Sequence, residues 1–294
     1  MPKIIYALGF FDGVHAGHAA LLAECKRLAQ EHHCLSGVVT FTSHPDALVS
    51  GAAPGLINTA ADRQRLLEHF GMDTVVALPF DKAMMTMHYK TFIRMLCSRY
   101  DGSGFVCGHD FRFGNRGEGN GEKLLSLCRE ESLPCTVVPE QKIDGITVSS
   151  TYIRTLLESG DMEQAARFLG HPHIFSSIVV PGQHLGSRLG FPTANLLLPD
   201  GLLCPRKGVY ACLAWVENTA YMAVTNVGDR PTVGGGYTTV ESWLIDFSGD
   251  LYGRTLTLEF HKYLRPEEKF GSLAELKAQI QKDGEKTRFL FKNT

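Results

Sequence analysis

The chain has 294 residues, of which 44% are hydrophobic, so its length and composition predict one large or two ordinary globular domains. It carries 29 basic and 31 acidic residues, and this near balance argues against nucleic acid or a membrane surface as its partner. No apolar run approaches the ~20 residues that a membrane-spanning helix needs. The first residues, Met1-Pro2-Lys3, lead into an apolar run without the pattern of a signal peptide. We expect a cytoplasmic protein that acts on small molecules, and the sequence gives no indication of its oligomeric state.

Eight cysteines are spread along the chain, and none of them forms a Cys-x-x-Cys pair. Several fall on the apolar faces of predicted elements. This distribution predicts reduced cysteines in a cytosolic protein rather than metal ligands or disulfide bridges.

In the first half of the chain, apolar strand-like runs alternate with amphipathic segments. The runs predict strands at 4–8, 37–41, 74–78, 105–107 and 136–138, and the segments between them predict helices at 19–33, 60–71, 88–100 and 122–131. This alternation predicts a doubly wound, mostly parallel, Rossmann-like α/β sheet covered on both faces. Ligands of such sheets bind at the carboxyl ends of the strands.

The first predicted strand is followed by a glycine-rich turn, residues 9–18, that leads into the first predicted helix. Glycines such as Gly9 and Gly17 let the backbone approach an anion, and free N–H groups at a helix start favour negative charge. His15 and His18 can stabilise phosphate oxygens as charge builds up in a transition state. Their spacing is not that of the zinc motif His-Glu-x-x-His. That the two histidines only cap a turn remains the alternative.

Further polar groups follow other predicted strands. His44 comes after the second strand, and Asp110 lies in the stretch Gly108–Arg116 after the fourth. Ser150, Thr151 and Arg154 begin a later helix, where hydroxyls, backbone N–H groups and a guanidinium can bind phosphate. An ordinary helix cap is the alternative for the two hydroxyls. The glycine cluster 114–121 is expected to be a mobile loop.

After residue 175 the helical periodicity nearly vanishes until residue 272. Short apolar and β-branched runs predict strands at 177–180, 208–216, 221–227, 238–247 and 255–260, and a closing helix at 272–282. Short strands without helices between them predict a mainly antiparallel β-barrel. We therefore expect two domains, residues 1–173 and 174–294.

A glycine-rich stretch early in this second domain, residues 182–195, is expected to be one loop. It contains Gly182, Gly186 and Arg188, which can wrap a phosphate chain, and ends in Pro-Thr-Ala-Asn. The hydroxyl of Thr193 and the amide oxygen of Asn195 are hard ligands that suit Mg²⁺. An ordinary turn-rich loop is the alternative.

Glu241 interrupts a predicted strand of the same domain. If its carboxylate points inward, it can act as a general base toward a substrate hydroxyl. If it points outward into solvent, it needs no functional explanation.

Several of these motifs occur together in a known order. They are GFFDGVHAGH, TFTSHP, GHDFRFG and SSTYIR in the first half, and GFPTAN, NVGDRPT and VESWLIDF in the second. The first resembles the ATP-binding signature of the HxGH nucleotidyltransferases, and the whole set resembles the bacterial bifunctional riboflavin kinase/FAD synthetase family. The resemblance runs from about residue 4 to residue 283. The chain departs from the family pattern at Ser43, His109 and Ser187, where the family tends to have Pro, Glu and Arg.

The resemblance implies two ATP-dependent reactions. The C-terminal barrel would phosphorylate riboflavin to FMN with Mg²⁺, with Glu241 as the base. The N-terminal domain would transfer AMP from ATP to FMN, giving FAD and pyrophosphate, with His15 and His18 as catalytic residues. The implied ATP-binding residues of the N-terminal domain are Gly9, Phe10, Gly17, His44, Asp110, Ser150, Thr151 and Arg154. Those implied for ATP, flavin or metal in the barrel are Gly182, Gly186, Arg188, Thr193 and Asn195.

Three other functions stay open at the level of sequence. Only one of the two domains could be active, since the chain departs from the family pattern in each. The N-terminal site could use another substrate, such as a pantetheine phosphate or a glycerol phosphate, although the fused barrel argues against this. The chain could also be a non-catalytic flavin-binding protein, which would have little need for Thr193, Asn195 and Glu241. Exposed aromatics such as Phe113 are candidates for stacking on a flavin ring.

Overall fold

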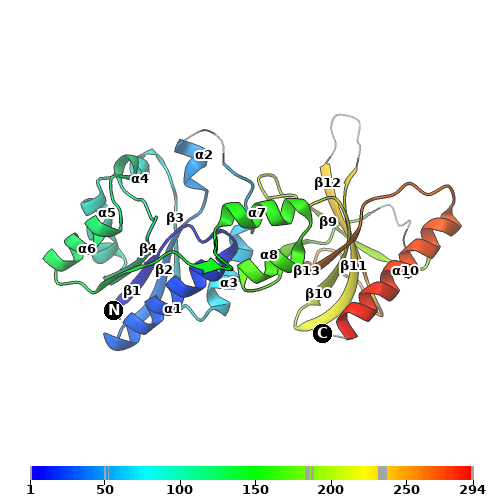
Figure 1. Cartoon of the computed structure of the whole chain (residues 1–294), viewed down its shortest axis with the longest axis horizontal. Helices are drawn as coiled ribbons and strands as arrows, with labels where there is room; N and C mark the ends of the chain where they lie inside the picture. The colour runs from blue at the N-terminus through cyan, green and yellow to red at the C-terminus, as the bar shows by residue number, and fades with distance from the viewer. Residues whose placement is uncertain are drawn as a thin grey trace. The chain divides into compact units, whose positions relative to one another are not determined.

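The computed structural model describes residues 2–49, 51, 53–182, 186, 189–230 and 237–292 (Figure 1). The chain divides into two compact units. Unit 1 consists of Met1–Pro54 and Ala60–Ser150, and unit 2 consists of Gly55–Thr59 and Thr151–Thr294. None of the helices within the described residues has the length and apolar character needed to cross a membrane.

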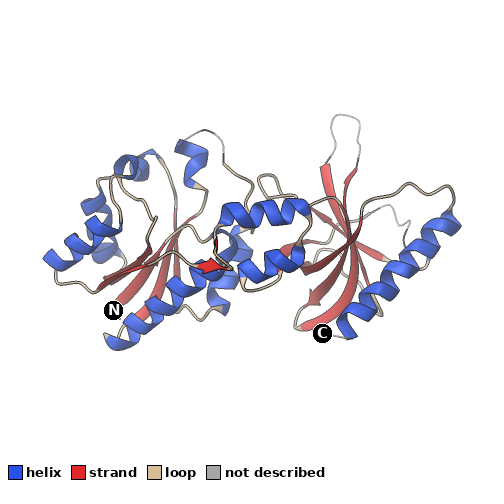
Figure 2. Ribbon diagram, in the orientation of Figure 1, coloured by secondary structure: helices blue, strands red, loops and turns tan. Residues whose placement is uncertain are grey.

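Unit 1 is built on a parallel sheet that has five strands among the described residues (Figure 2). The strands are β1 (Ile4–Leu8), β2 (Leu35–Phe41), β3 (Thr74–Leu78), β4 (Gly102–Gly108) and β5 (Cys135–Val138). Their order is β3-β2-β1-β4-β5, and every neighbouring pair is parallel. The predicted doubly wound sheet is confirmed. The strand order reverses beside β1, which is where sheets of this kind bind their ligands.

The helices of unit 1 connect these strands, as amphipathic segments between buried strands require. They are α1 (Ala16–Glu31), α2 (Pro45–Val49), α3 (Ala60–His69), α4 (Lys82–Thr86), α5 (Tyr89–Arg99) and α6 (Gly121–Glu130). Two short 3-10 helices, η1 (Asp12–Val14) and η2 (Asn115–Gly117), and a hairpin of β6 (Lys142–Ile143) and β7 (Ile146–Thr147) complete the unit. Helix α1 packs on β1, β2 and β4.

The glycine-rich segment before α6 is a packed turn. Gly119 and Phe113 exchange both backbone hydrogen bonds, at 2.8 and 3.2 Å. Gly114 has φ +77° and lies so close to Tyr89 that a Cβ atom would come within 2.8 Å of it. The aromatic ring of Phe113 is 7% exposed in the unit 1 core, and it stacks on Phe111 with a centroid distance of 5.4 Å. The prediction that Phe113 is an exposed stacking residue was wrong, because the glycines let this segment fold back and bury the ring.

Unit 2 combines helices with an antiparallel sheet of six strands in the described part of the chain. The helices are α7 (Ser150–Ser159), whose first residue belongs to unit 1, α8 (Met162–Leu169) and α10 (Leu273–Lys292). The strands are β8 (His173–Ile178), β9 (Thr193–Leu197), β10 (Gly208–Val216), β11 (Thr219–Arg230), β12 (Tyr237–Leu244) and β13 (Thr255–Arg265). The order is β8-β13-β10-β11-β12-β9, and a bridge between Val180 and Asn195 joins the two edges. This closure gives the predicted antiparallel barrel.

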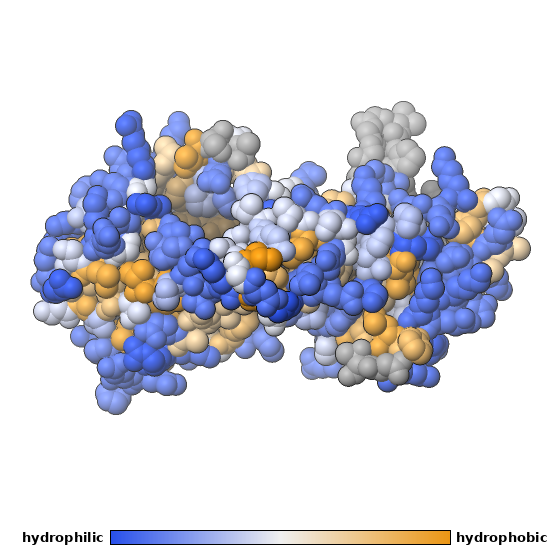
Figure 3. Space-filling view, in the orientation of Figure 1, coloured by the Kyte–Doolittle hydropathy of each residue, from blue (hydrophilic) through white to orange (hydrophobic). Residues whose placement is uncertain are grey.

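Alternate residues of the barrel strands face an apolar interior. The buried interior residues include Ala194, Tyr210, Cys212, Ala223, Thr225, Val240, Ser242, Leu258 and Phe260. The residues between them face outward. Helix α10 covers part of the outer face, because Gly284 lies so close to Trp243 that a Cβ atom would approach the indole to 2.7 Å. Figure 3 shows mainly hydrophilic residues on the visible face of the chain, with separate apolar patches.

All eight cysteines lie within the described ranges, and each has a free thiol. Burial raises the pKa values of Cys25, Cys107 and Cys212 to about 12, so these thiols are protonated at neutral pH.

Candidate active sites

The turn after β1 has an unusual backbone. Gly13 has φ +81°, and two non-glycine residues, Phe11 and Val14, have φ +61° and +39°. A β-branched residue with positive φ is a genuine outlier, because its side chain crowds the following backbone. The turn is held by hydrogen bonds from the Ser150 hydroxyl to the Asp12 carbonyl (2.9 Å) and from Val14 N to the Phe11 carbonyl (3.2 Å). Backbone strain of this kind clusters at functional sites.

The strained turn presents two stacked imidazoles. His15 caps helix α1, and its Nδ1 accepts a hydrogen bond from the backbone N–H of His18 at 3.2 Å. The two rings are parallel within 9° and their centroids are 3.6 Å apart. Because Nδ1 of His15 is an acceptor, the neutral ring carries its proton on Nε2, where it can be donated. A Cβ atom on Gly17 would lie 3.2 Å from the His15 ring, so a side chain at this position would press on the imidazole.

The second imidazole is buried and uncharged. Burial lowers the pKa of His18 well below 6.5, and the charges of His15 and Arg63 lower it further. Its Nδ1 atom is buried and has no hydrogen-bond partner among the described residues. His18 is therefore a neutral imidazole at pH 7 with unused hydrogen-bonding capacity.

Arg63 of helix α3 is a charged neighbour that the motif analysis missed. Its side chain lies in the core, with the residue 3% exposed. Its Nη2 donates to the carbonyl of Phe41 at 2.7 Å, and its Cζ lies 4.2 Å from the centroid of the Phe10 ring. Burial lowers its pKa, and the Asp12 charge opposes that shift. The sequence does hold a signal, because Arg63 occupies the same helical face as Leu66 and Leu67.

Two more predicted residues lie near the carboxyl edge of the sheet. His44 contacts the edge of the Phe10 ring at a centroid distance of 4.7 Å, and its Nδ1 accepts from Asp46 N at 3.1 Å. Asp110, after β4, has an 82% exposed side chain that lies 4.0 Å from His109. The structure thus groups His44 with Phe10 and Arg63, and it leaves the Asp110 carboxylate facing solvent.

The predicted phosphate-binding helix is α7. Ser150 begins it in unit 1, where its hydroxyl supports the histidine turn. Thr151, the next residue, is exposed. Arg154 belongs to unit 2, and its Nε donates to the carbonyl of Gly55 at 2.8 Å. The hydroxyl of Thr151 and the guanidinium of Arg154 therefore lie about one turn apart at the start of α7, where the sequence predicts a phosphate-binding helix end.

A row of polar side chains crosses three strands of the barrel. Glu241 on β12 pairs directly with Asn195 on β9 and with Asn226 on β11. Directly opposed residues in a sheet project to the same face, so Asn195, Glu241 and Asn226 form one polar row. Their chain neighbours Ser242 and Thr225 point to the interior, where their hydroxyls are 2.9 Å apart. Glu241 therefore does not point into the barrel interior, the orientation that a general base was expected to have. It lies on the outer face of the barrel wall, where it is half-buried rather than fully solvated.

Glycines border this polar row on the β9 side. A Cβ atom on Gly182 would collide with the side chain of Asn195, and one on Gly186 would lie 3.3 Å from Oγ1 of Thr193. The structure therefore brings Gly182, Gly186, Thr193 and Asn195 together. The prediction that residues 182–195 form one loop was wrong at its end, because Thr193 and Asn195 lie in strand β9. Arg188 lies outside the described residues.

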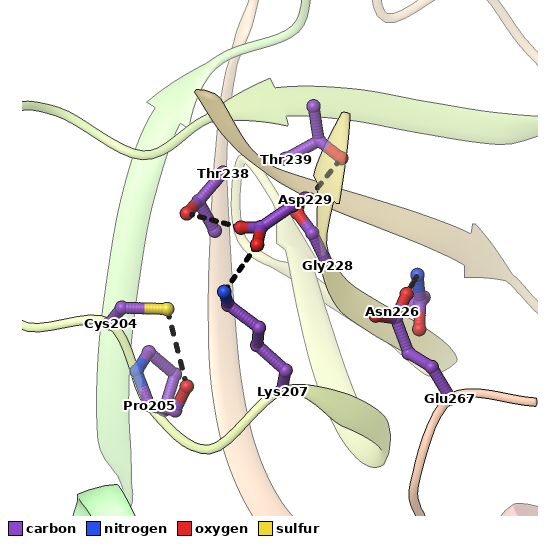
Figure 4. Close-up of polar contacts among 9 residues, drawn as sticks. All are labelled: Cys204, Pro205, Lys207, Asn226, Gly228, Asp229, Thr238, Thr239 and Glu267. Atoms are coloured by element: carbon purple, nitrogen blue, oxygen red, sulfur yellow. Dashed lines mark hydrogen bonds and ion pairs between the residues drawn. The ribbon is translucent and has the colours of Figure 1, made fainter. Parts of the chain in front are cut away.

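Charged residues adjoin the polar row on the β11 side (Figure 4). Asp229 belongs to the motif NVGDRPT, whereas Lys207 and Glu267 lie outside the motifs found in the sequence. The Nδ2 atom of Asn226 donates to Oε1 of Glu267 at 3.0 Å. Lys207 pairs with Asp229, which also accepts a hydrogen bond from Thr238 at 3.2 Å. These contacts place alternating positive and negative charge at one end of β11.

Two protein families match this chain, one in each half of the sequence. The FAD synthetase family matches residues 1–152, and the riboflavin kinase family matches residues 169–291. A bifunctional riboflavin kinase/FMN adenylyltransferase from Bacillus subtilis strain 168 is 33% identical over 296 residues, which cover 99% of this chain and 93% of its own. The enzyme of the same description from Escherichia coli strain K12 is 34% identical and covers 95% of this chain and 90% of its own. The chain belongs to the bifunctional riboflavin kinase/FMN adenylyltransferase family.

A solved structure extends this relation to the fold. The crystal structure of a protein described as a macrolide-efflux protein from Streptococcus pneumoniae matches with a TM-score of 0.87 at 28% identity. The match covers 98% of this chain and 94% of that one. The parallel sheet followed by the barrel is therefore shared with that protein over nearly the full length of both chains.

The barrel has two oxygen atoms that could bind Mg²⁺, one on Asn195 and one on Thr193. Oδ1 of Asn195 is buried and has no hydrogen-bond partner in the described ranges, so it is an amide oxygen with free lone pairs. The Thr193 hydroxyl lies two residues earlier in the same strand, on the same face. Two neutral oxygens fit Mg²⁺, which keeps several waters and also binds substrate phosphates. Elsewhere in the described residues, no cluster of three or more His, Cys, Asp or Glu side chains could hold a metal ion.

Proposed function

We propose that residues 174–294 phosphorylate riboflavin and that residues 1–173 adenylylate the FMN that results, with ATP as the donor in both reactions. Membership of the family assigns the chain both activities, riboflavin kinase and FMN adenylyltransferase. One observation carries the assignment to specific residues. The stacked pair of His15 and His18 and the polar row at Glu241 occur in one chain, each within the family match that needs it.

In the kinase reaction, Glu241 accepts the proton of the terminal ribityl hydroxyl of riboflavin. The hydroxyl oxygen then attacks the γ-phosphorus of ATP, and ADP leaves. Asn195 and Asn226 flank the carboxylate and orient it, while Gly182, Gly186 and Arg188 surround the phosphates. Mg²⁺, held through Thr193 and Asn195, would neutralise phosphate charge when bound. The work of the protein is positioning and charge stabilisation.

In the adenylyltransferase reaction, a phosphate oxygen of FMN attacks the α-phosphorus of ATP, and pyrophosphate leaves. A phosphate monoester is already a competent nucleophile at neutral pH, so the site needs no strong base. His15 donates its Nε2 proton in a hydrogen bond to a phosphate oxygen, and neutral His18 supplies a second one. Ser150, Thr151 and Arg154 bind the triphosphate. The remaining residues proposed to contact ATP are Gly9, Phe10, Gly17, His44 and Asp110.

The test is one incubation with riboflavin, ATP and Mg²⁺, followed by chromatographic separation of the flavins. The wild-type protein should form FMN first and FAD later. The His18→Ala variant should accumulate FMN and form FAD about 10²–10³ times more slowly, as expected when one group that stabilises developing charge is removed. The Glu241→Gln variant should fail on riboflavin but convert added FMN to FAD. A His18→Ala protein that makes FAD at the wild-type rate would exclude this role for the histidine pair.

A further inference from the structure

Arg63 is a buried cation whose hydrogen bonding is incomplete. A guanidinium has five N–H donors. One of its nitrogens, Nη2, donates to the carbonyl of Phe41, but Nη1 is buried and has no hydrogen-bond partner in the part of the chain that the structure describes. Burying a charge costs free energy unless other groups compensate for it. The same unit also contains a strained backbone at Val14, which costs free energy for a different reason. Two unfavourable features of this kind in one unit indicate that the cation has a function.

The contacts of Arg63 place this charge at the carboxyl edge of the sheet. Phe41 is the last residue of β2, and Phe10 lies just after β1. The guanidinium packs over the Phe10 ring, and the same ring contacts His44. One side chain therefore supports both the turn that leads to His15 and His18 and the segment that leads to His44.

The charged or titratable groups that act on His18 are His15, directly before α1, and Arg63 of α3, and Asp12 of η1 acts on Arg63. The neighbouring segments also carry Asp62 on α3, His44 after β2 and Asp46 on α2. Of these, His15 and Arg63 disfavour a positive charge on His18, and Asp12 interacts with Arg63. The Oδ1 atom of Asp62 lies 3.8 Å from Nη1 of the exposed Arg65, one turn further along the same helix. Burial is the main reason that the imidazole of His18 is uncharged, and the nearby charges add to it.

We propose that Arg63 is a positioning residue for adenylyl transfer. Its contacts with Phe10 and Phe41 fix the loops that carry the histidines, and its buried charge adds to the effect of burial in keeping His18 a neutral hydrogen-bonding imidazole until a polyphosphate binds. This inference rests on the proposed function of the histidine pair. When the negative polyphosphate arrives, its charge offsets that of Arg63. The pKa of His18 then rises, and the ring takes up a proton as negative charge builds on the leaving pyrophosphate.

The experiment uses the full chain, three arginine variants and His18→Gln. Arg63→Met removes the charge, Arg63→Lys retains it, and Arg65→Met removes an exposed charge from the same helix as a matched control. The ring signals of His18, assigned by their loss in His18→Gln, are titrated by NMR. We expect the pKa of His18 to rise in Arg63→Met and to stay near the wild-type value in Arg63→Lys and Arg65→Met.

FAD formation from FMN should fall at least tenfold in Arg63→Met, with its pH optimum moved upward, and should fall much less in Arg63→Lys.

A second measurement uses the wild-type protein alone. Calorimetric binding of inorganic pyrophosphate at pH 6, in two buffers of different ionisation enthalpy, should show net proton uptake that is absent in His18→Gln. The inference is overturned if pyrophosphate binds without proton uptake. It is also overturned if Arg63→Met and Arg63→Lys lose FAD formation equally while the titration of His18 is unchanged, since Arg63 would then be only structural.

The outcomes separate this inference from the proposed function. Riboflavin kinase activity, measured in every variant, reports whether unit 2 is folded, and the dispersion of the proton NMR signals in the same titration reports whether unit 1, which contains Arg63, is folded. The NMR titration needs no catalysis, so it tests the charge effect even if His18 proves dispensable. Full FAD formation by His18→Ala would overturn the proposed function, whatever the titration shows.

Discussion

His173 in strand β8 shows how burial of one ionisable residue affects the stability of unit 2. It is 3% exposed, and its ring packs on Phe260 at a centroid distance of 5.6 Å. Burial lowers its pKa from 6.5 to about 3, and the charge of His171 adds to the shift. The folded pKa lies below the unfolded one, so between these values the unfolded chain binds more protons than the folded chain. The stability contribution is therefore complete above about pH 6.5 and is lost as the pH falls toward 3.

The lowered pKa of His173 predicts that the free energy of unfolding of unit 2 decreases in mild acid. One group contributes about 1.4 kcal/mol per pH unit, so the free energy of unfolding should fall by about 2 kcal/mol between pH 6.5 and pH 5 from His173 alone. The two tryptophans of the chain, Trp215 and Trp243, both lie in unit 2, so urea unfolding followed by tryptophan fluorescence reports on this unit. His173→Phe keeps an aromatic ring and should reduce the dependence by that amount. An equally steep dependence in the variant would contradict the prediction.

Among single residues, the sequence predicted the candidate site residues that belong to recognisable motifs. It did not predict those whose role depends on how the chain packs. His15, His18 and Glu241 stand at fixed places in motifs whose chemistry is interpretable. Arg63 is one arginine in an amphipathic helix, and only the packed structure shows that its guanidinium points inward. Glu267 lies next to Asn226 only because β13 returns beside β10, a pairing across many residues that local patterns do not encode.

At the scale of elements, helix α10 is attached to the barrel by two ion pairs of similar chemistry and different burial. Arg265 donates from Nε and Nη2 to Asp283 at 3.0 and 2.9 Å, and the two side chains are 12% and 1% exposed. Arg288 binds Asp246 with two hydrogen bonds at 2.6 and 2.7 Å, but the Asp246 side chain is 68% exposed. Water competes for the second pair and hardly reaches the first.

We expect Asp283→Ala to lower the free energy of unfolding of unit 2 by about 3–5 kcal/mol, because it leaves the Arg265 guanidinium buried without its partner. The matched variant Asp246→Ala removes a carboxylate that pairs with the same helix and should have a much smaller effect. Urea unfolding monitored by tryptophan fluorescence measures both. Equal losses in the two variants would show that burial does not distinguish these pairs.

Element boundaries were predicted well where a hydrophobic period was regular and poorly where another constraint prevailed. The strands at 4–8, 74–78 and 208–216 match the structure residue for residue. Strand β9 was hidden because Pro192 precedes it and glycines surround it, features typical of a turn. Helix α10 continues to Lys292 past Gly284, because the missing side chain there allows close packing on Trp243 and does not end the helix.

At the scale of the whole molecule, the histidine pair and the polar row at Glu241 belong to different compact units, each with its own sheet. His18 belongs to unit 1 and Glu241 to unit 2. Because each unit buries its own core, loss of one site should leave the other one folded and active. FMN released by one chain should therefore serve as substrate for another.

A mixture of two inactive variants tests this independence. His18→Ala should convert riboflavin to FMN and stop, while Glu241→Gln should leave riboflavin unchanged. Mixed in equal amounts with riboflavin, ATP and Mg²⁺, the two variants should make FAD after a lag, because FMN must accumulate in solution before the second chain can bind it. Adding FMN at the start should remove the lag. If the mixture yields FMN but no FAD, while Glu241→Gln alone still converts added FMN, then FMN does not pass through solution between chains, and the two sites do not act independently.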